Sequence, residues 1–343
     1  MDLAAFKAKL KSSNPAGWFI ISGEEDYLKK YYMNNLRSLL VSPDDPFAPF
    51  NCVSFEGEDI DFASVREAVK SPPMMSEYKL IEWKYANLDG LKESEVKALE
   101  SLFHLKSEYE YVAFLILANS DGFDTGTPKK PTKLYKRLSA GFDIVDFPRS
   151  SDAQLNSWLK KHFEAEGIMA DAKSINALIF RSGRSMEVLN NEVIKLASFA
   201  KSNGKNAINE ADVAKIASST VECDAFALSN AVLEKNAEVA FGALLDLKQR
   251  RVEPPTVVAM LERTYSDLVS VALLLDEGNG AASIEEILKF HPFKTKLYIN
   301  AAKKVGSRAL SEALAELCRI DASSKSGGMS GYGVIEMFIA ERL

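Results

Sequence analysis

A strand, a glycine and a helix follow one another near the start of the chain, in the order that nucleotide-binding proteins use to cradle phosphates. The apolar run 18–22 ends at Gly23, and a helix-forming segment begins at about Asp26, the predicted N-cap residue. A phosphate loop needs a second glycine and a Lys-Ser/Thr pair, and the loop GEEDYLKK has neither. Glu24, Glu25 and Asp26 would moreover repel an anionic ligand. We interpret these residues, together with Gly23, as a degenerate phosphate loop that binds no nucleotide or other cofactor.

Histidine and cysteine, the other residue types that support catalysis or metal binding, are few and scattered. None of the three histidines belongs to an H-x-x-x-H pair, and the three cysteines do not have a metal-ligand spacing. The sequence contains neither G-x-S-x-G nor G-x-G-x-x-G. We therefore predict no catalytic residue and no metal site. The few, widely separated cysteines indicate a reduced, cytoplasmic setting.

The stretch 69–83, VKSPPMMSEYKLIEW, carries two adjacent methionines between a helical pattern and a strand pattern. Pro72 and Pro73 precede them, and proline both lacks a backbone donor and restricts the residue before it. Met74 and Met75 are therefore predicted to lie on a short, stiff tip between the helix and the strand. Methionine is flexible and polarizable, which suits it to the groove of a partner. The alternative is that both side chains pack into the protein's own core, where large apolar residues usually lie.

Strand and helix patterns alternate over residues 1–147, which predicts an α/β domain with a parallel sheet. The run 111–119 is the most apolar of the strand patterns, as expected for a strand that is buried on both faces. The strand patterns fall at 18–22, 51–59, 78–86, 111–119 and 142–147, and the helical patterns at 26–40, 60–70, 93–104 and 133–141.

Helical patterns dominate from residue 150 to the end of the chain. Four of them predict a compact helical domain, with N-caps at Ser151 or Asp152, at Asp171 and at Asn209. Residues 220–343 hold about five further helical patterns. Because 343 residues are too many for one ordinary core, the length predicts two or three domains. The change of pattern favours three, with the boundaries 1–147, 148–217 and 218–343.

The net charge of −6 argues against a protein that binds DNA by itself, since such proteins usually carry a broad basic surface. The basic residues within 129–137 are more typical of a solvated helix face. Any contact with DNA is therefore expected to be local or shared with other subunits. The chain has no apolar run of the roughly 18 residues that a membrane helix needs, and we predict no membrane partner.

Several segments, in the same order along the chain, resemble the delta-subunit family of the bacterial DNA polymerase III clamp loader. Singly they are weak signals, but together, at these spacings, they cover essentially the whole chain. They are WFIISGEEDYLKKYY, PPMMSEYKLIEWK, the run from SWLKKHFEAEG to LASFA with INEADV after it, LKQRRVEPPTVVAMLERTYSDL, KFHPFKTKLYINAAKK and ELCRIDASSKSG.

The resemblance implies a degenerate AAA+ module followed by an all-helical collar. Residues 1–147 would form its α/β part, 148–217 the helical lid and 218–343 the collar that joins subunits into a pentameric ring. The implied function is to bind the ring-shaped sliding clamp, the beta subunit, and to open it for loading onto primed DNA during replication. The other ring members would be gamma/tau-type and delta-prime-type subunits. ATP would be hydrolysed by those neighbours, so the chain would be a non-enzymatic subunit of the cytoplasmic DNA polymerase III holoenzyme.

The resemblance also places the clamp contact on Pro73, Met74 and Met75, where the family more often has aromatic residues or leucine. The alternative function is a catalytically active AAA+ ATPase of the clamp-loader or replication-initiator type. The residues missing between Gly23 and Lys30 argue against that alternative, because they are the ones that hold phosphates.

Overall fold

The structure, a computed structural model, describes residues 1–12, 14–42, 44–127, 129–328 and 331–343. The chain divides into two compact units, which we call the N-terminal unit (residues 1–150) and the helical unit (residues 151–343). The division into three domains stays a prediction. Among the described residues, no helix combines the length and the apolar character that crossing a membrane requires.

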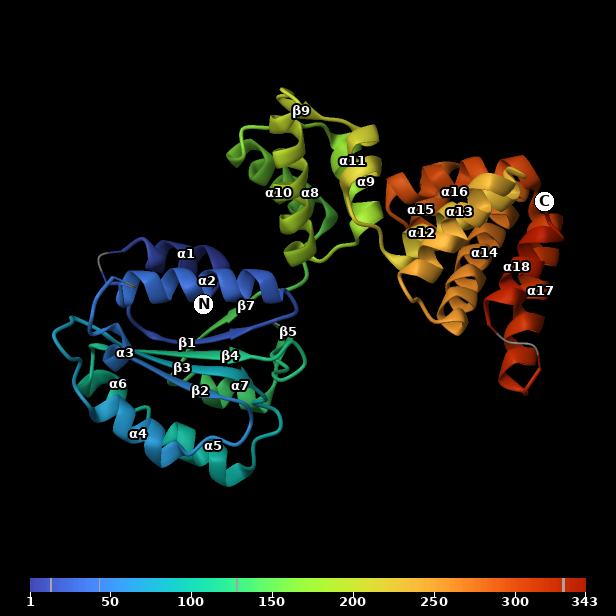
Figure 1. The fold of residues 1–343 in the computed structure, drawn as a ribbon. Helices are drawn as coiled ribbons and strands as arrows, with labels where there is room; N and C mark the ends of the chain where they lie inside the picture. Colours follow the sequence, from blue (N-terminus) through green and yellow to red (C-terminus); the bar gives the residue numbers. More distant parts are fainter. Residues whose placement is uncertain (13, 43, 128, 329–330) are drawn as a thin grey trace. The chain divides into compact units, whose positions relative to one another are not determined.

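The N-terminal unit is built on a five-stranded sheet in which all neighbouring strands run parallel (Figure 1). The strand order is β2-β3-β4-β1-β7, so the first strand in sequence lies inside the sheet and the chain crosses over between strands. This confirms the predicted parallel α/β fold. The strands are β1 (Trp18–Ser22), β2 (Cys52–Glu56), β3 (Lys79–Ala86), β4 (Val112–Ala118) and β7 (Asp143–Asp146).

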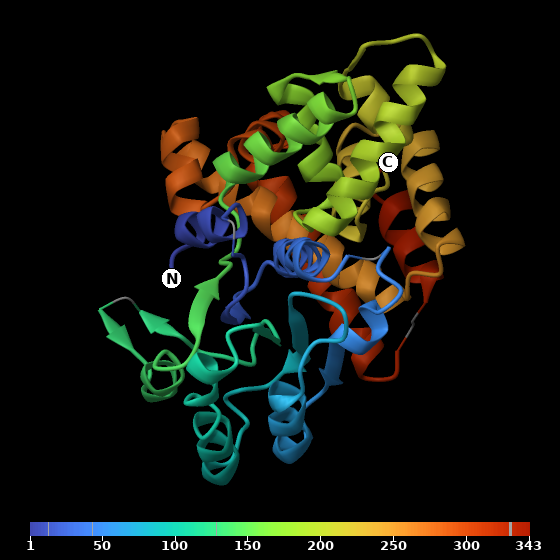
Figure 2. The ribbon, with the colours of Figure 1, turned by 90° about the vertical axis from the view of Figure 1, so that its left-hand side faces the viewer.

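Helices cover both faces of this sheet. On one face, α1 (Leu3–Leu10) and α2 (Asp26–Leu40) contribute to a buried apolar cluster with side chains of the strands. On the other face, the partners of the strands are α4 (Phe62–Lys70), α5 (Glu93–Glu100), α6 (Leu105–Glu108) and α7 (Lys133–Leu138). Figure 2 shows the same layers from a second side, with the dark-blue and cyan helices on opposite faces of the strands. A four-residue helix, α3 (Ala48–Asn51), leads directly into β2.

Burial follows the apolar pattern of the sequence. All seven residues of β4 are buried, which confirms the prediction of a strand covered on both faces. The predicted helix 93–104 is shorter than expected: α5 ends at Glu100, and a turn separates it from α6. A small antiparallel hairpin, β5 (Gly126–Thr127) with β6 (Lys130–Pro131), was not predicted, because two-residue strands leave no periodicity to detect.

The helical unit begins with the four helices that the sequence predicts. Ser151, Asp171 and Asn209 act as N-caps, each accepting a backbone hydrogen bond in the first turn. The helices are α8 (Asp152–Ala165), α9 (Ala172–Ser182), α10 (Met186–Ser202) and α11 (Glu210–Ile216), and a short parallel pair, β8 (Met169–Ala170) with β9 (Ala207–Ile208), joins two of their connections.

The rest of the helical unit contains seven helices over its described residues, where about five were predicted. One missed boundary lies between α12 and α13, where Lys235 adopts a left-handed backbone (φ 55°) and no glycine or proline marks the turn. The long α14 forms the centre of the buried apolar cluster. These helices are α12 (Val221–Leu233), α13 (Ala237–Gln249), α14 (Pro254–Asp276), α15 (Ala281–Leu288), α16 (Pro292–Val305), α17 (Ser307–Lys325) and α18 (Tyr332–Ala340).

Candidate functional site at the two edges of the parallel sheet

The parallel strands give the N-terminal unit two chemically different edges. The degenerate phosphate loop follows the carboxyl end of β1, whereas the tip that carries Met74 and Met75 precedes the amino end of β3. Since all five strands point the same way, the loop and the tip lie at opposite edges. In open α/β sheets, ligands bind outside the carboxyl ends of the strands, so the loop edge is where a nucleotide would be expected.

The phosphate-loop position is held against the segment after β7 by backbone hydrogen bonds. The backbone N–H of Glu25 donates to the carbonyl oxygen of Phe147 at 3.0 Å, and the N–H of Phe147 donates to Ser22 O at 2.8 Å. Gly23 has φ +102°, and a Cβ built on it would lie 2.3 Å from Phe147 O. The N–H of Glu25, a group of the kind that cradles phosphate in a nucleotide-binding loop, is therefore directed to the segment after β7.

Lys29 is buried at this edge, and the sequence analysis did not identify it as a site residue. Its side chain is only 1% exposed, and its Nζ donates to the carbonyl oxygen of Ala118 at 3.1 Å and lies 2.9 Å from Asp26 Oδ1. Counted from Gly23, Lys29 stands where the lysine of G-x-x-x-x-G-K would stand. This spacing could have identified Lys29 from the sequence. It is not recognisable as a phosphate-loop motif because the second glycine and the Ser/Thr are missing.

Asp26 lies inside the first turn of α2, and its prediction as N-cap is wrong by one residue. Glu25 occupies the N-cap position, while the carboxylate of Asp26 pairs with Lys29 and accepts a hydrogen bond from the hydroxyl of Ser120 at 3.1 Å. Burial raises the pKa of Asp26, but the hydrogen bonds and the positive charge of Lys29 outweigh it, so the pKa lies below its ordinary value.

The cavity beside Lys29 is small. It has a volume of about 120 Å³ and is lined in part by Lys30, Tyr85 and Asn119. Small-molecule sites usually measure roughly 300 Å³ or more. A separate, more open hollow beside Gly23 and Glu24 reaches about 300 Å³, and the carboxylates of Asp124 and Asp146 also line it. The described residues also contain no group of three or more His, Cys, Asp or Glu side chains placed to hold a metal ion.

The opposite edge presents apolar side chains to solvent. Met75 is 82% exposed and Met74 47%, while Pro73 is half-buried. Met75 has a left-handed backbone (φ 51°), which is rare for a residue with a side chain and is sustained only where the surroundings impose it. The alternative that both methionines pack into the protein's own core is therefore wrong. Their role in binding a partner stays a prediction.

The tip is held by polar contacts from three sides. Asn51, which is fully buried, donates from Nδ2 to Met74 O at 2.8 Å and accepts from the Met74 N–H at 2.7 Å. The buried Lys79 donates to the carbonyl oxygen and to the hydroxyl of Ser71, and burial lowers the pKa of Lys79. The Tyr111 hydroxyl reaches Lys70 O at 3.4 Å. Because these contacts order the backbone in advance, a partner would meet a preformed tip.

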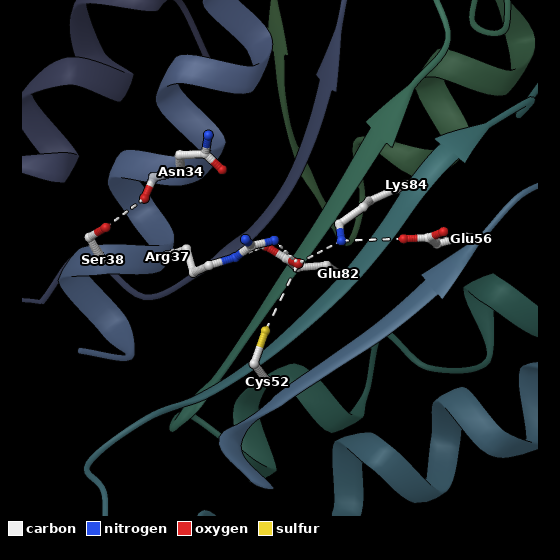
Figure 3. A network of polar contacts seen from close by, with 7 residues as sticks. All are labelled: Asn34, Arg37, Ser38, Cys52, Glu56, Glu82 and Lys84. Atoms are coloured by element: carbon white, nitrogen blue, oxygen red, sulfur yellow. Dashed lines mark hydrogen bonds and ion pairs between the residues drawn. The ribbon is translucent and has the colours of Figure 1, made fainter. Parts of the chain in front are cut away.

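An ion-pair network links α2 to the strands between the two edges (Figure 3). Glu82 on β3 is 1% exposed and receives two bonds from the guanidinium of Arg37, Nε to Oε1 at 2.9 Å and Nη2 to Oε2 at 2.5 Å. Lys84 Nζ lies 3.6 Å from the same carboxylate, and Cys52 Sγ lies 3.9 Å from it. Burial, followed by the negative charge of Glu82, raises the pKa of the Cys52 thiol. We interpret this network as a structural link that holds helix α2 against the sheet.

The strand order and the helical region that follows define a parallel α/β module with flanking helices and a mostly helical C-terminal part. Comparison with known proteins identifies the family. The family described as "DNA polymerase III, delta subunit" matches residues 19–140, and "DNA polymerase III delta subunit, C-terminal domain" matches residues 222–342. The chain therefore belongs to the DNA polymerase III delta-subunit family.

Two relatives illustrate this similarity. The DNA polymerase III subunit delta of Bacillus subtilis (strain 168) is 23% identical over 331 residues, which are 95% of this chain and 92% of that protein. A solved DNA clamp loader delta protein of Bacillus subtilis is 21% identical, with a TM-score of 0.59 and coverage of 98% of each chain. At this identity the structural match shows a shared fold.

Proposed function

We propose that this protein is a clamp-loader subunit that binds the DNA polymerase sliding clamp through Pro73, Met74 and Met75 and opens it, without hydrolysing ATP itself. The observation that carries the proposal is the exposed and preformed methionine tip, in a chain of the delta-subunit family. Large apolar side chains held in water by a buried asparagine are unfavourable for an isolated protein and favourable for one that docks them in a groove.

The expected contact is small in area but strong per residue. Burying one methionine side chain contributes roughly 1.5 to 3 kcal/mol, and a few such anchors typically dominate an interface. The tip backbone is already fixed by Asn51, so less conformational entropy is lost on binding. Pro73 is half-buried and would mainly shape the tip, while the two methionines enter the groove.

Opening the clamp requires a difference in affinity between two clamp states. A subunit that bound open and closed clamps equally well would shift nothing, however tightly it bound. We therefore propose that the tip fits the open interface better, and that ATP bound by neighbouring subunits controls access to the tip. The phosphate loop, which lacks the second glycine and the Ser/Thr and bonds Phe147 instead, supports a role in which this chain does not hydrolyse ATP.

The remaining partners follow from the same role. Residues 218–343 would form a collar with gamma/tau-type and delta-prime-type subunits in a pentameric ring, residues 148–217 would be the lid, and primed DNA would be held within the assembled complex. The lack of a large excess of positive charge, with a net charge of −6, fits a chain that meets DNA only together with other subunits.

The direct test measures binding of the purified full chain to the sliding clamp of the same organism, without nucleotide, by surface-based or calorimetric titration. The Met74→Ala/Met75→Ala variant is expected to lose about a hundredfold or more in affinity, since two anchors are truncated. Met169→Ala/Met337→Ala is the matched control, because these methionines are 60% and 50% exposed but lie in the helical unit. Equal affinity of the tip variant and the wild type would refute the site.

The opening step and the lack of ATP hydrolysis need separate measurements. A clamp labelled with a fluorophore pair across one subunit interface should lose energy transfer when the wild-type chain is added, and should keep it with the tip variant. Titration with a fluorescent ATP analogue should show no saturable binding to the isolated chain. Tight ATP binding would contradict our interpretation of the loop edge and would favour an active ATPase.

A further inference from the structure

Phe50 is a second exposed apolar group at the edge of the sheet that carries the tip. It is 61% exposed, and among the described residues only Met75 is a more exposed large apolar side chain. Phe50 lies on the short helix α3, immediately before Asn51 and β2. An aromatic side chain that could pack against a core is instead directed to water in a segment that also contains Pro46 and Pro49.

Strand pairing brings this segment to the tip. β2 and β3 are parallel neighbours, and Cys52 pairs with Leu80 at their amino ends. Phe50 and Met75 therefore precede adjacent strands at the same edge, although 25 residues separate them in sequence.

Asn51 joins the two segments physically. Its fully buried side chain forms hydrogen bonds with both backbone polar groups of Met74, at 2.7 and 2.8 Å. Asn51 directly follows Phe50 in the chain. A side-chain amide that satisfies the N–H and the C=O of one distant residue fixes the relative position of the two backbones. The position of Phe50 relative to the methionines is thus set before any partner arrives.

We propose that Phe50, Met74 and Met75 form one docking surface, held together by Asn51, with Phe50 as a third anchor for the apolar groove of the sliding clamp. This inference rests on the proposed function and extends it to a residue outside the tip. The three side chains lie on two segments that the Asn51–Met74 hydrogen bonds join, and both segments contain prolines. Aromatic residues are enriched among the anchors that dominate interfaces. Asn51 is a positioning residue, because it acts through the backbone of Met74.

The first test measures clamp affinity for Phe50→Ala and Phe50→Leu beside wild type and Met74→Ala/Met75→Ala. Phe50→Ala should weaken binding at least about tenfold, as expected for a truncated anchor, and Phe50→Leu should recover most of the loss. Tyr31→Ala is the matched control, since Tyr31 is a 52% exposed aromatic residue on α2, on one face of the sheet.

The outcomes separate this inference from the proposed function. If the methionine variant loses binding and Phe50→Ala does not, the inference is wrong and the proposed function stands. If neither the wild type nor any variant binds the clamp, the proposed function fails and this inference fails with it. If Phe50→Ala changes self-association of the chain and leaves clamp affinity unchanged, the surface serves a second copy of the chain and the inference is wrong.

The second test addresses Asn51 with a double-mutant cycle. Asn51→Ala should weaken clamp binding about tenfold in the wild-type background, and much less when Met74 and Met75 are already alanine, because residues that act through one another are not additive. Affinities are measured well below the unfolding temperature of each variant, so that lost stability alone does not change them. An equal loss in both backgrounds would show that Asn51 has only a structural role, and if Asn51→Ala does not fold, the Phe50 series decides.

Discussion

The two edges of the sheet in the N-terminal unit differ in what their polar groups hold in place. At the loop edge, groups that would bind phosphate have partners within the protein: Lys29 bonds Ala118 and Asp26, and Glu25 bonds Phe147. At the tip edge, polar groups are equally well satisfied by Asn51 and Lys79, but they are used to hold Met74 and Met75 in water. At one edge the buried Lys29 is satisfied inside the protein, and at the other the methionines stay in solvent, where we propose that a partner binds.

This difference fits the proposed function, in which a nucleotide-binding architecture serves as an interaction module. The fold needs its strand-to-helix junction after β1 whether or not a nucleotide binds there, so the junction is retained and stabilised internally. The tip contributes little to the core and is free to carry apolar anchors. Mutations at the loop edge should therefore change stability and spare clamp binding, and mutations at the tip edge should do the reverse.

Gly23→Ala should have the largest effect on stability. The added Cβ would lie within 2.6 Å of three backbone atoms of Phe147, at a φ of +102°, so the loop must move and we expect a loss of more than about 3 kcal/mol. Urea unfolding measures it. Gly57→Ala is the control: φ is +87° with no atom within 4 Å of the new Cβ, so only backbone strain of about 1 kcal/mol is expected. Similar losses for both variants would show that the contact with Phe147 is unimportant.

Lys29→Met should have the next largest effect. The substitution keeps the aliphatic volume but leaves Ala118 O without its buried donor and Asp26 without its partner, which should cost about 1 to 3 kcal/mol in unfolding free energy. Lys30→Met, at the exposed neighbouring position, should change it by less than about 0.5 kcal/mol. A more stable Lys29→Met protein would contradict this prediction and would show that the buried ammonium group destabilises the fold.

Asp26→Asn tests the same edge through pH, with a smaller effect. Because the folded pKa of Asp26 is lowered, the carboxylate contributes stability that is present above its unfolded pKa and is lost as pH falls through the folded pKa, below about pH 4. The wild type should thus be more stable than the variant at pH 7, and the difference should vanish in strong acid. Thermal unfolding of both proteins between pH 7 and pH 2.5 measures this difference in stability. A difference that persists at pH 2.5 would contradict the charge-based explanation.

Met74→Ala/Met75→Ala should have the smallest effect on stability, although it should have a large effect on clamp binding. Met75 is 82% exposed, so the free energy of unfolding should change by less than about 0.5 kcal/mol, while clamp affinity falls. Urea unfolding beside the binding titration gives both numbers. A large loss of stability would show that the tip is part of the core, and its effect on binding would then be indirect.

Local pattern predicted much of this protein. Short apolar runs between helical patterns located the five strands of the sheet, and the caps at Ser151, Asp171 and Asn209 located helices in the helical unit. Pro72 and Pro73 marked the tip before β3. These features depend on neighbours within a few residues, which is the range over which propensity and periodicity act.

Long-range contacts decided the properties of the site. Whether Met74 and Met75 are exposed, and that Phe50 lies at the same edge, depends on the pairing of β2 with β3 and on Asn51, 23 residues from its partner. No local pattern indicates that Glu82, which lies within an apolar strand, is paired with Arg37. The strands, most of the helices and the missing phosphate-loop residues could be identified from local pattern. Which polar groups are satisfied internally, and which apolar groups stay in water, depends on the three-dimensional fold, because burial and pairing join segments that no local pattern connects.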